Sequence, residues 1–216
     1  MAIEALEAAR AADGVTSRPD TLAHLQCATP EDVARIGRNG FHVAFTYSWM
    51  YAEPKGYSLS TVPFFDKVVG NSHESLHNPN NYFERCTYPA KAALEAGALL
   101  TAGSDAPVLT QDPQPFVNME IGVTRSRRGL LPLSPWQRLT VQEVIDAYTI
   151  NGARTLGRAT EIGSLEVGKS ADFIIVDQDI LKLANSGQPE KIGDTKVVQT
   201  WFKGEKVYAR DRNLSR

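Results

Sequence analysis

The chain is poor in several features that would point to a particular partner. Lys and Arg number 23 against 25 Asp and Glu among its 216 residues, a net charge of -2. Without a basic excess, no electrostatic field draws in nucleic acid or anionic lipid. No apolar run approaches the roughly 18 residues that indicate a membrane-spanning helix. We therefore expect a cytoplasmic globular protein that binds a small molecule, with neither nucleic acid nor membrane as a partner.

Cysteine is also scarce, because the chain contains only two, Cys27 and Cys86. They lack the close spacing of metal-binding knuckles or redox-active pairs. We interpret both as buried thiols, which behave as small hydrophobic residues. A disulfide between them is an alternative that the sequence alone does not support.

What is present, over residues 1–160, is an alternation of apolar strands and helices. The predicted strands cover 21–26, 41–48 and 99–105, and the predicted helices cover 1–14, 29–40, 88–97, 114–125 and 140–156. Their ends carry familiar signals, such as Gly14 after the first helix, Thr29 before the second, and the capping box of Thr140 with Glu143 before the last. A long irregular stretch reaches from residue 48 to about 82, and loops of that length are usually functional.

From about residue 161 the pattern changes to short strands separated by glycine turns. GSLEVGKSADFIIVD is followed by VVQTWFKGEKVY, which predicts a hairpin about Lys203-Gly204, with no helix between the two segments. The predicted fold is therefore α/β. It has a parallel β/α part over residues 1–160 and a small antiparallel β module over 161–216.

HESLH, residues 73–77, matches the HExxH pattern of zinc proteases, in which both histidines bind the metal from one helix face. The flanks oppose a helix, since Gly70 precedes the motif and Asn78-Pro79 follows it, so at most one turn can form. A zinc protease is therefore the third-ranked function. Two other interpretations stay open: His73 or His77 touches substrate from a loop over a pocket, or both are solvated loop residues.

Two polar residues stand at the ends of predicted parallel strands. His24 ends the predicted strand TLAHLQ, and Asp105 ends the predicted strand LLTAGSD. Taken singly, His24 reads as a hydrogen-bonded core histidine and Asp105 as a turn residue. Together they would project from the carboxyl ends of parallel strands, where an imidazole and a carboxylate can share one divalent ion. Coincidence is the alternative that spacing does not exclude.

Several stretches resemble the amidohydrolase superfamily of metal-dependent hydrolases, specifically amidohydrolase family 3, the branch with exoenzyme-like and imidazolone-like members. AHLQCATPEDVARIGRNG is similar to the family's sixth-strand segment, and YPAKAALEAGALLTAGSDAPV to its last barrel strand. LTVQEVIDAYTINGARTLG resembles the helix that follows. GSLEVGKSADFIIVDQDI and VVQTWFKGEKVY resemble the β module that flanks the barrel. The likeness covers nearly the whole chain.

The resemblance implies the C-terminal part, about three strands, of a (β/α)8 barrel. It also implies that His24 is a metal ligand and that Asp105 is both a ligand and the proton shuttle, with zinc as the expected divalent metal. The implied activity is hydrolysis of carbon-nitrogen bonds in amides or cyclic amides. The family's earlier ligands have no counterpart here, so we expect a fragment that self-associates or pairs with the missing barrel half. A non-catalytic fragment or interaction module is the alternative.

Five further residues are candidates for substrate binding or support of the site. Arg125 has the planar guanidinium that binds a substrate carboxylate, unless it is a surface arginine like its neighbours. Trp49 alternates with Tyr47 and Tyr51 at strand spacing, which suits either an aromatic pocket or core packing. Gln26 lies two residues beyond His24 and would face the same side.

Overall fold

The computed structural model describes the chain apart from residues 16, 18, 53–75, 108–110, 128 and 211–216. Its elements in chain order are α1 (Ala2–Asp13), β1 (Thr21–Ala23), α2 (Pro30–Arg38), β2 (His42–Phe45), η1 (Tyr47–Trp49), α5 (Tyr82–Cys86), α6 (Ala90–Glu95), β3 (Leu99–Ala102), α7 (Pro115–Thr124), η3 (Pro135–Gln137), α8 (Val141–Tyr148), α9 (Ile150–Thr155), β4 (Phe173–Val176), α10 (Ile180–Asn185), η4 (Pro189–Asp194), β5 (Val197–Phe202) and β6 (Glu205–Ala209).

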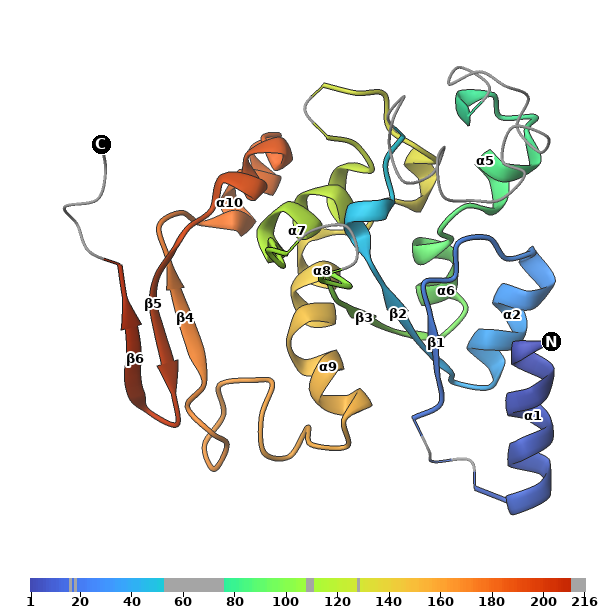
Figure 1. Ribbon diagram of the computed structural model, residues 1–216, viewed down its shortest axis with the longest axis horizontal. Helices are drawn as coiled ribbons and strands as arrows, with labels where there is room; N and C mark the ends of the chain where they lie inside the picture. The colour runs from blue at the N-terminus through green and yellow to red at the C-terminus, as the bar shows by residue number, and fades with distance from the viewer. Residues whose placement is uncertain (16, 18, 53–75, 108–110, 128, 211–216) are drawn as a thin grey trace.

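The first sheet is parallel, as predicted, with the strand order β1-β2-β3. In the middle strand, Ala44 pairs with Ala23 of β1 on one side and with Thr101 of β3 on the other. Figure 1 shows the three strands side by side, with α1 and α2 beyond β1, and α8 and α9 beyond β3. Since all three strands run the same way, their carboxyl ends lie at one edge of the sheet.

The predicted helix signals are present in the structure. Gly14 adopts a left-handed conformation with φ 69° and ends α1. The Thr29 hydroxyl accepts a hydrogen bond from the backbone N–H of Asp32 at 3.1 Å and begins α2. Thr140 and Glu143 form the predicted capping box of α8. The Thr29 and Thr140 caps satisfy N–H groups that the first turn of a helix leaves unpaired, and the Gly14 N–H satisfies the Arg10 carbonyl in the last turn of α1.

The helix predicted over 140–156 is wrong in one respect, because it is divided into α8 and α9 at Thr149. Thr149 has φ -125° and ψ -98°, outside the helical region. Its hydroxyl donates to the Ile145 carbonyl at 2.8 Å. A threonine hydroxyl that bonds the preceding turn competes with the helix backbone and favours a bend at this position.

The core of the molecule lies between this sheet and its covering helices. Ile36, Phe41, Val43 and Leu100 are almost completely buried there. The helices α2 and α6 approach so closely that a Cβ at Gly37 would lie 2.0 Å from the Ala96 carbonyl oxygen. Only glycine permits such an approach.

The second sheet is antiparallel, with the order β4-β5-β6, and it includes the predicted hairpin about Lys203-Gly204. The expectation that no helix separates β4 from β5 is wrong, since α10 and η4 lie between them. The Asp179 carboxylate accepts a hydrogen bond from Lys182 N–H at 3.0 Å and caps α10. This cap, followed by the apolar residues of ILKLAN at helical spacing, is the sequence signal for the extra helix.

One contact region joins the second sheet to the first part of the chain. The turn η4 packs on α7, with Ile192 fully buried in the main core. The Glu120 carboxylate of α7 accepts a hydrogen bond from the Gly193 N–H at 2.9 Å. Among the described residues, no helix has the length and apolar character that crossing a membrane requires.

Candidate metal-binding site at the carboxyl edge of the parallel sheet

His24 directly follows β1, at the carboxyl edge of the parallel sheet. Its backbone N–H donates to the Ala44 carbonyl at 2.8 Å and so extends the ladder by one residue. His24 and Leu25 both have positive φ angles, 68° and 40°. Positive φ is uncommon for residues other than glycine and concentrates at functional sites. The chain therefore turns sharply at His24 and leaves the sheet.

The His24 imidazole stacks on the indole of Trp49, with the ring centroids 4.7 Å apart and an angle of 16° between the planes. Trp49 belongs to η1, directly after β2, and is only 4% exposed. The Nδ1 atom of His24 is buried and has no hydrogen-bond partner among the described residues. Burying an unpaired polar nitrogen is unfavourable. A cation or an additional polar group would satisfy this atom.

Asp105 follows β3 at the same edge. Gly103, two residues earlier, donates its N–H to the Phe45 carbonyl at 3.0 Å and continues the ladder beyond the strand. Asp105 is half-buried and has a positive φ of 52°. Because β2 separates β1 from β3, the ends of the two outer strands lie about 10 Å apart at ordinary strand spacing. One ion would contact both residues only if both side chains leaned over β2.

A buried asparagine that the sequence analysis missed supports this edge. Asn118 of α7 accepts a hydrogen bond from Ser48 N–H at 2.8 Å and donates to the carbonyls of Pro113 and Gln114 at 3.2 Å. It thereby connects η1, which carries Trp49, to the start of α7. An amide within the mostly apolar stretch PFVNMEIGV is the signal that would have found it.

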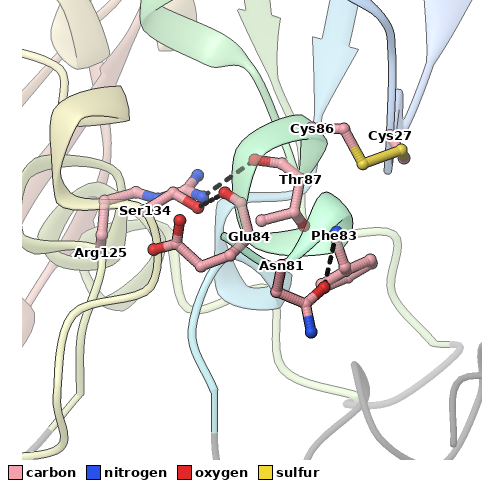
Figure 2. The surroundings of a disulfide bond; sticks show 8 residues. All are labelled: Cys27, Asn81, Phe83, Glu84, Cys86, Thr87, Arg125 and Ser134. Atoms are coloured by element: carbon pink, nitrogen blue, oxygen red, sulfur yellow. Dashed lines mark hydrogen bonds between the residues drawn. A yellow bond between two sulfur atoms is a disulfide. The ribbon is translucent and has the colours of Figure 1, made fainter. Parts of the chain in front are cut away.

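The expectation of two buried thiols is wrong, since Cys27 and Cys86 form a disulfide. Figure 2 shows the bond between the segment after His24 and the end of α5. The backbone brings them together, because Tyr88 N–H donates to the Gln26 carbonyl at 2.9 Å. Cys27 is also exposed rather than buried. The sequence did not reveal this pairing, since the cysteines are 59 residues apart.

Arg125 is not a surface arginine, and its contact with a substrate carboxylate stays a prediction. Its side chain is fully buried. Its guanidinium donates to the carbonyls of Leu133 at 2.8 Å, Tyr88 at 3.2 Å and Thr87 at 3.3 Å. Burial lowers the pKa of Arg125 to about 9, while attraction to Tyr88 and Glu84 opposes that shift. Figure 2 shows Arg125 facing the end of α5, which it fixes in place.

The remaining candidates lie at or near this edge. Tyr47 and Trp49 do not alternate along a strand, because both belong to the turn η1 and are buried. Burial raises the pKa of Tyr47. Gln26 and His24 line an open hollow of ≈ 580 Å³, together with Ala23, Leu25, Cys27, Tyr82 and Phe83.

The HESLH stretch is only partly described by the structure. His73 lies in the segment 53–75, outside the described residues, so the predictions for His73 and for a zinc-protease helix remain predictions. His77 is half-buried and follows Leu76, which is fully buried against Phe83 and Leu133. A substrate contact by His77 also stays a prediction.

The donors of His24 and Asp105 fit a divalent cation in kind, because an imidazole nitrogen and a carboxylate oxygen are common zinc ligands. The unpaired Nδ1 of His24 agrees with such a role. Within the described ranges, however, no group of three or more potential ligands gathers at one point. These residues would therefore hold a metal as two of its ligands, and further ligands must come from elsewhere.

Comparison with known proteins identifies the family. The model of the amidohydrolase family matches residues 1–208, which is nearly the whole chain. The chain therefore belongs to the amidohydrolase family.

Two curated relatives illustrate its place in that family. It is 32% identical over 123 residues to the N-substituted formamide deformylase of Arthrobacter pascens, a match that covers 57% of this chain and 22% of the relative. It is 32% identical over 120 residues to the imidazolonepropionase of Bdellovibrio bacteriovorus, covering 56% of this chain and 25% of the relative.

Solved structures show the same fold over most of the chain. An uncharacterized metal-dependent hydrolase from Pyrococcus horikoshii aligns with a TM-score of 0.60 and 20% identity, over 85% of this chain and 34% of that structure. An adenosine deaminase from Xanthomonas campestris with bound zinc aligns with a TM-score of 0.54 and 19% identity, over 86% of this chain and 36% of that structure. The chain spans well under half the length of each of these four proteins.

Proposed function

We propose that this chain is part of a metal-dependent hydrolase that cleaves carbon-nitrogen bonds in small amides or cyclic amides. The observation that carries the proposal is the placement of His24 and Asp105 after parallel strands, at one edge of the sheet, within a member of the amidohydrolase family. The relatives named for action on formamides and imidazolones support the proposed substrate class. Zinc is the proposed metal, since one neighbouring structure contains it.

The proposed architecture is a segment of a (β/α)8 barrel, residues 1–160, followed by the β module of residues 161–216. In parallel β/α barrels, catalytic residues stand at the carboxyl ends of the strands, which is where both candidates lie. The described strands leave the outer edges of β1 and β3 unpaired. Open edges favour pairing with further strands, from a second copy of the chain or from the rest of a barrel.

Each candidate residue has a defined role in the proposed reaction. A bound divalent cation makes water acidic enough to attack a carbonyl near neutral pH. His24 would hold the cation through a ring nitrogen. The Asp105 carboxylate would accept the proton of the attacking water and deliver it to the leaving nitrogen. The hollow beside His24, ≈ 580 Å³ in volume, falls in the size range of small-molecule sites.

A second candidate function is a non-catalytic module that keeps the fold without the chemistry. It is favoured by one observation, namely that the described residues assemble no set of three metal ligands. Two protein ligands rarely hold zinc tightly. Metal affinity therefore separates the two candidates.

The test is equilibrium dialysis against zinc combined with hydrolysis of an N-substituted formamide, for the wild-type chain, His24→Ala and Asp105→Asn. The hydrolase proposal predicts zinc binding that weakens in both variants. Where a second copy or the rest of a barrel supplies the remaining ligands, it also predicts turnover that Asp105→Asn nearly abolishes. Glu205→Gln, an exposed change on β6, is the matched control and should leave both unchanged. Undiminished turnover in Asp105→Asn would exclude Asp105 as the proton shuttle. Zinc binding that neither site variant alters would favour the non-catalytic module.

A further inference from the structure

We propose that Trp49 is a positioning residue that orients the imidazole of His24 for metal binding, an inference that rests on the proposed function. An imidazole binds a metal through a lone pair in the plane of its ring. Rotation of the ring about its bond to Cβ therefore moves the ligating nitrogen. Whatever fixes the ring plane also fixes where a metal can bind.

In most metal sites, a hydrogen bond to the second ring nitrogen fixes that plane. His24 lacks this support among the described residues, since its buried Nδ1 has no hydrogen-bond partner there. The interaction present instead is the stack on Trp49, with centroids 4.7 Å apart and the planes within 16° of parallel. A ring that rotated out of this plane would lose the face-to-face contact. The indole therefore takes the orienting role that a carboxylate or carbonyl usually has.

Trp49 suits this role because it is itself held firmly. Its backbone N–H donates to the Thr46 carbonyl at 3.0 Å within η1. The residue before it, Ser48, is bonded to the buried Asn118 of α7. The indole is 4% exposed, so surrounding side chains restrict its motion.

The stack also connects two neighbouring strands, because His24 follows β1 and Trp49 follows β2. The backbone turn at His24, with its positive φ, directs the side chain, and the indole then limits its rotation. The imidazole plane is thereby fixed relative to the sheet edge that also carries Asp105. The imidazole would therefore already have the orientation that metal binding requires before a metal binds.

The experiment is a cobalt(II) chloride titration of the full chain, followed by NMR of the histidine ring signals. The variants are Trp49→Met, whose side chain fills space but has no flat ring for the imidazole to stack on, and Trp49→Phe, which restores a flat ring. We expect cobalt to broaden the His24 signals of the wild type, at a concentration that rises at least about tenfold in Trp49→Met. Trp49→Phe should restore most of the cobalt affinity that Trp49→Met loses.

The matched control is Trp201→Met. Trp201 also stacks on an aromatic ring, that of Phe173, with centroids 5.5 Å apart and an angle of 10°, but it lies in the second sheet. Its substitution should leave the cobalt titration of His24 unchanged. An equal loss in Trp201→Met and Trp49→Met would show a general effect on stability and overturn the positioning role.

A second measurement needs no substitution and so does not depend on variants that fold. Nuclear Overhauser contacts between the His24 and Trp49 rings should persist when zinc chloride is added to the wild type. Their disappearance on zinc binding would overturn the proposal.

Failure of the proposed function looks different from failure of the positioning role. If cobalt broadens His24 equally in the wild type and Trp49→Met, the metal site stands and the positioning role falls. If cobalt leaves His24 unaffected in the wild type although the ring contacts are present, the metal site itself is refuted.

Discussion

The parallel sheet of β1, β2 and β3 and the antiparallel sheet of β4, β5 and β6 are both rich in apolar residues, but they bury them to different extents. Val43 of β2 is 0% exposed, whereas Val207 of β6 is 60% exposed and Phe202 of β5 is 53% exposed. Helices cover the first sheet, while the second contacts the first part of the chain mainly through η4 and α10.

The difference shows that strand residues alone do not make a core. The parallel sheet gains its core from the crossover helices that parallel connections require. The same connections place the ends of its strands at one edge, which is where His24 and Asp105 lie. Four changes to the chain test this contrast.

The largest expected effect comes from the disulfide, which lies wholly within the first region. The double variant Cys27→Ser with Cys86→Ser should lower the free energy of unfolding by about 4 kcal/mol, because the bond closes a long loop in the unfolded chain. The check is denaturant unfolding with and without a reducing agent. Reduction should destabilise the wild type to the same extent and leave the double variant unaffected. A wild type insensitive to reductant would contradict the pairing.

Gly37→Ala should destabilise the first region by about 3 kcal/mol, since its Cβ would collide with a backbone carbonyl that cannot move aside easily. Gly152→Ala of α9 is the control, because a Cβ there meets nothing within 4 Å. It should be neutral or stabilising by up to about 1 kcal/mol. Thermal unfolding of both variants measures the difference, and equal effects would refute the close approach of α2 and α6.

A pair of identical substitutions compares the two sheets directly. Val43→Ala should cost about 2 kcal/mol, because it removes buried methyl groups from the core. Val207→Ala on the exposed strand β6 should change stability by less than about 0.5 kcal/mol. Urea titrations give both values. A large cost for Val207→Ala would mean that something covers the second sheet in solution.

The smallest expected effect concerns Glu120, which joins the two regions. Burial raises the pKa of Glu120, although the hydrogen bond from Gly193 lowers it, so the folded state disfavours the ionised form. The contribution of Glu120 to the free energy of unfolding is most favourable at pH values below the ordinary pKa of a glutamate. That contribution is lost as the pH rises through the raised pKa of the folded state. Glu120→Gln keeps an acceptor for Gly193 and should raise the melting temperature at pH 7 by about 2 °C. The gain should vanish near pH 3, and a gain independent of pH would contradict the raised pKa.

The sequence was sufficient for the features that depend on neighbouring residues. The caps at Gly14, Thr29 and Thr140, the three parallel strands and the Lys203-Gly204 hairpin all follow from local patterns. The division of the predicted helix 140–156 at Thr149 could not be predicted in this way. The hydrogen bond from the Thr149 hydroxyl to the preceding turn does not change the spacing of apolar residues along the sequence.

Features that depend on distant contacts were beyond the sequence. The Cys27–Cys86 pair and the burial of Arg125 both require α5 to lie beside segments far away along the chain. The stack of His24 on Trp49 likewise joins two strands, and spacing alone suggested strand alternation for Trp49. For the candidate site, the sequence predicted the strand ends at which His24 and Asp105 lie, while the stack of His24 on Trp49 is evident only from the structure.

The most direct test of the account is X-ray diffraction of zinc-soaked crystals at the zinc absorption edge. The account predicts an anomalous peak about 2 Å from both a ring nitrogen of His24 and a carboxylate oxygen of Asp105. Zinc bound at other residues, with His24 and Asp105 too far apart for one ion to touch both, would contradict it.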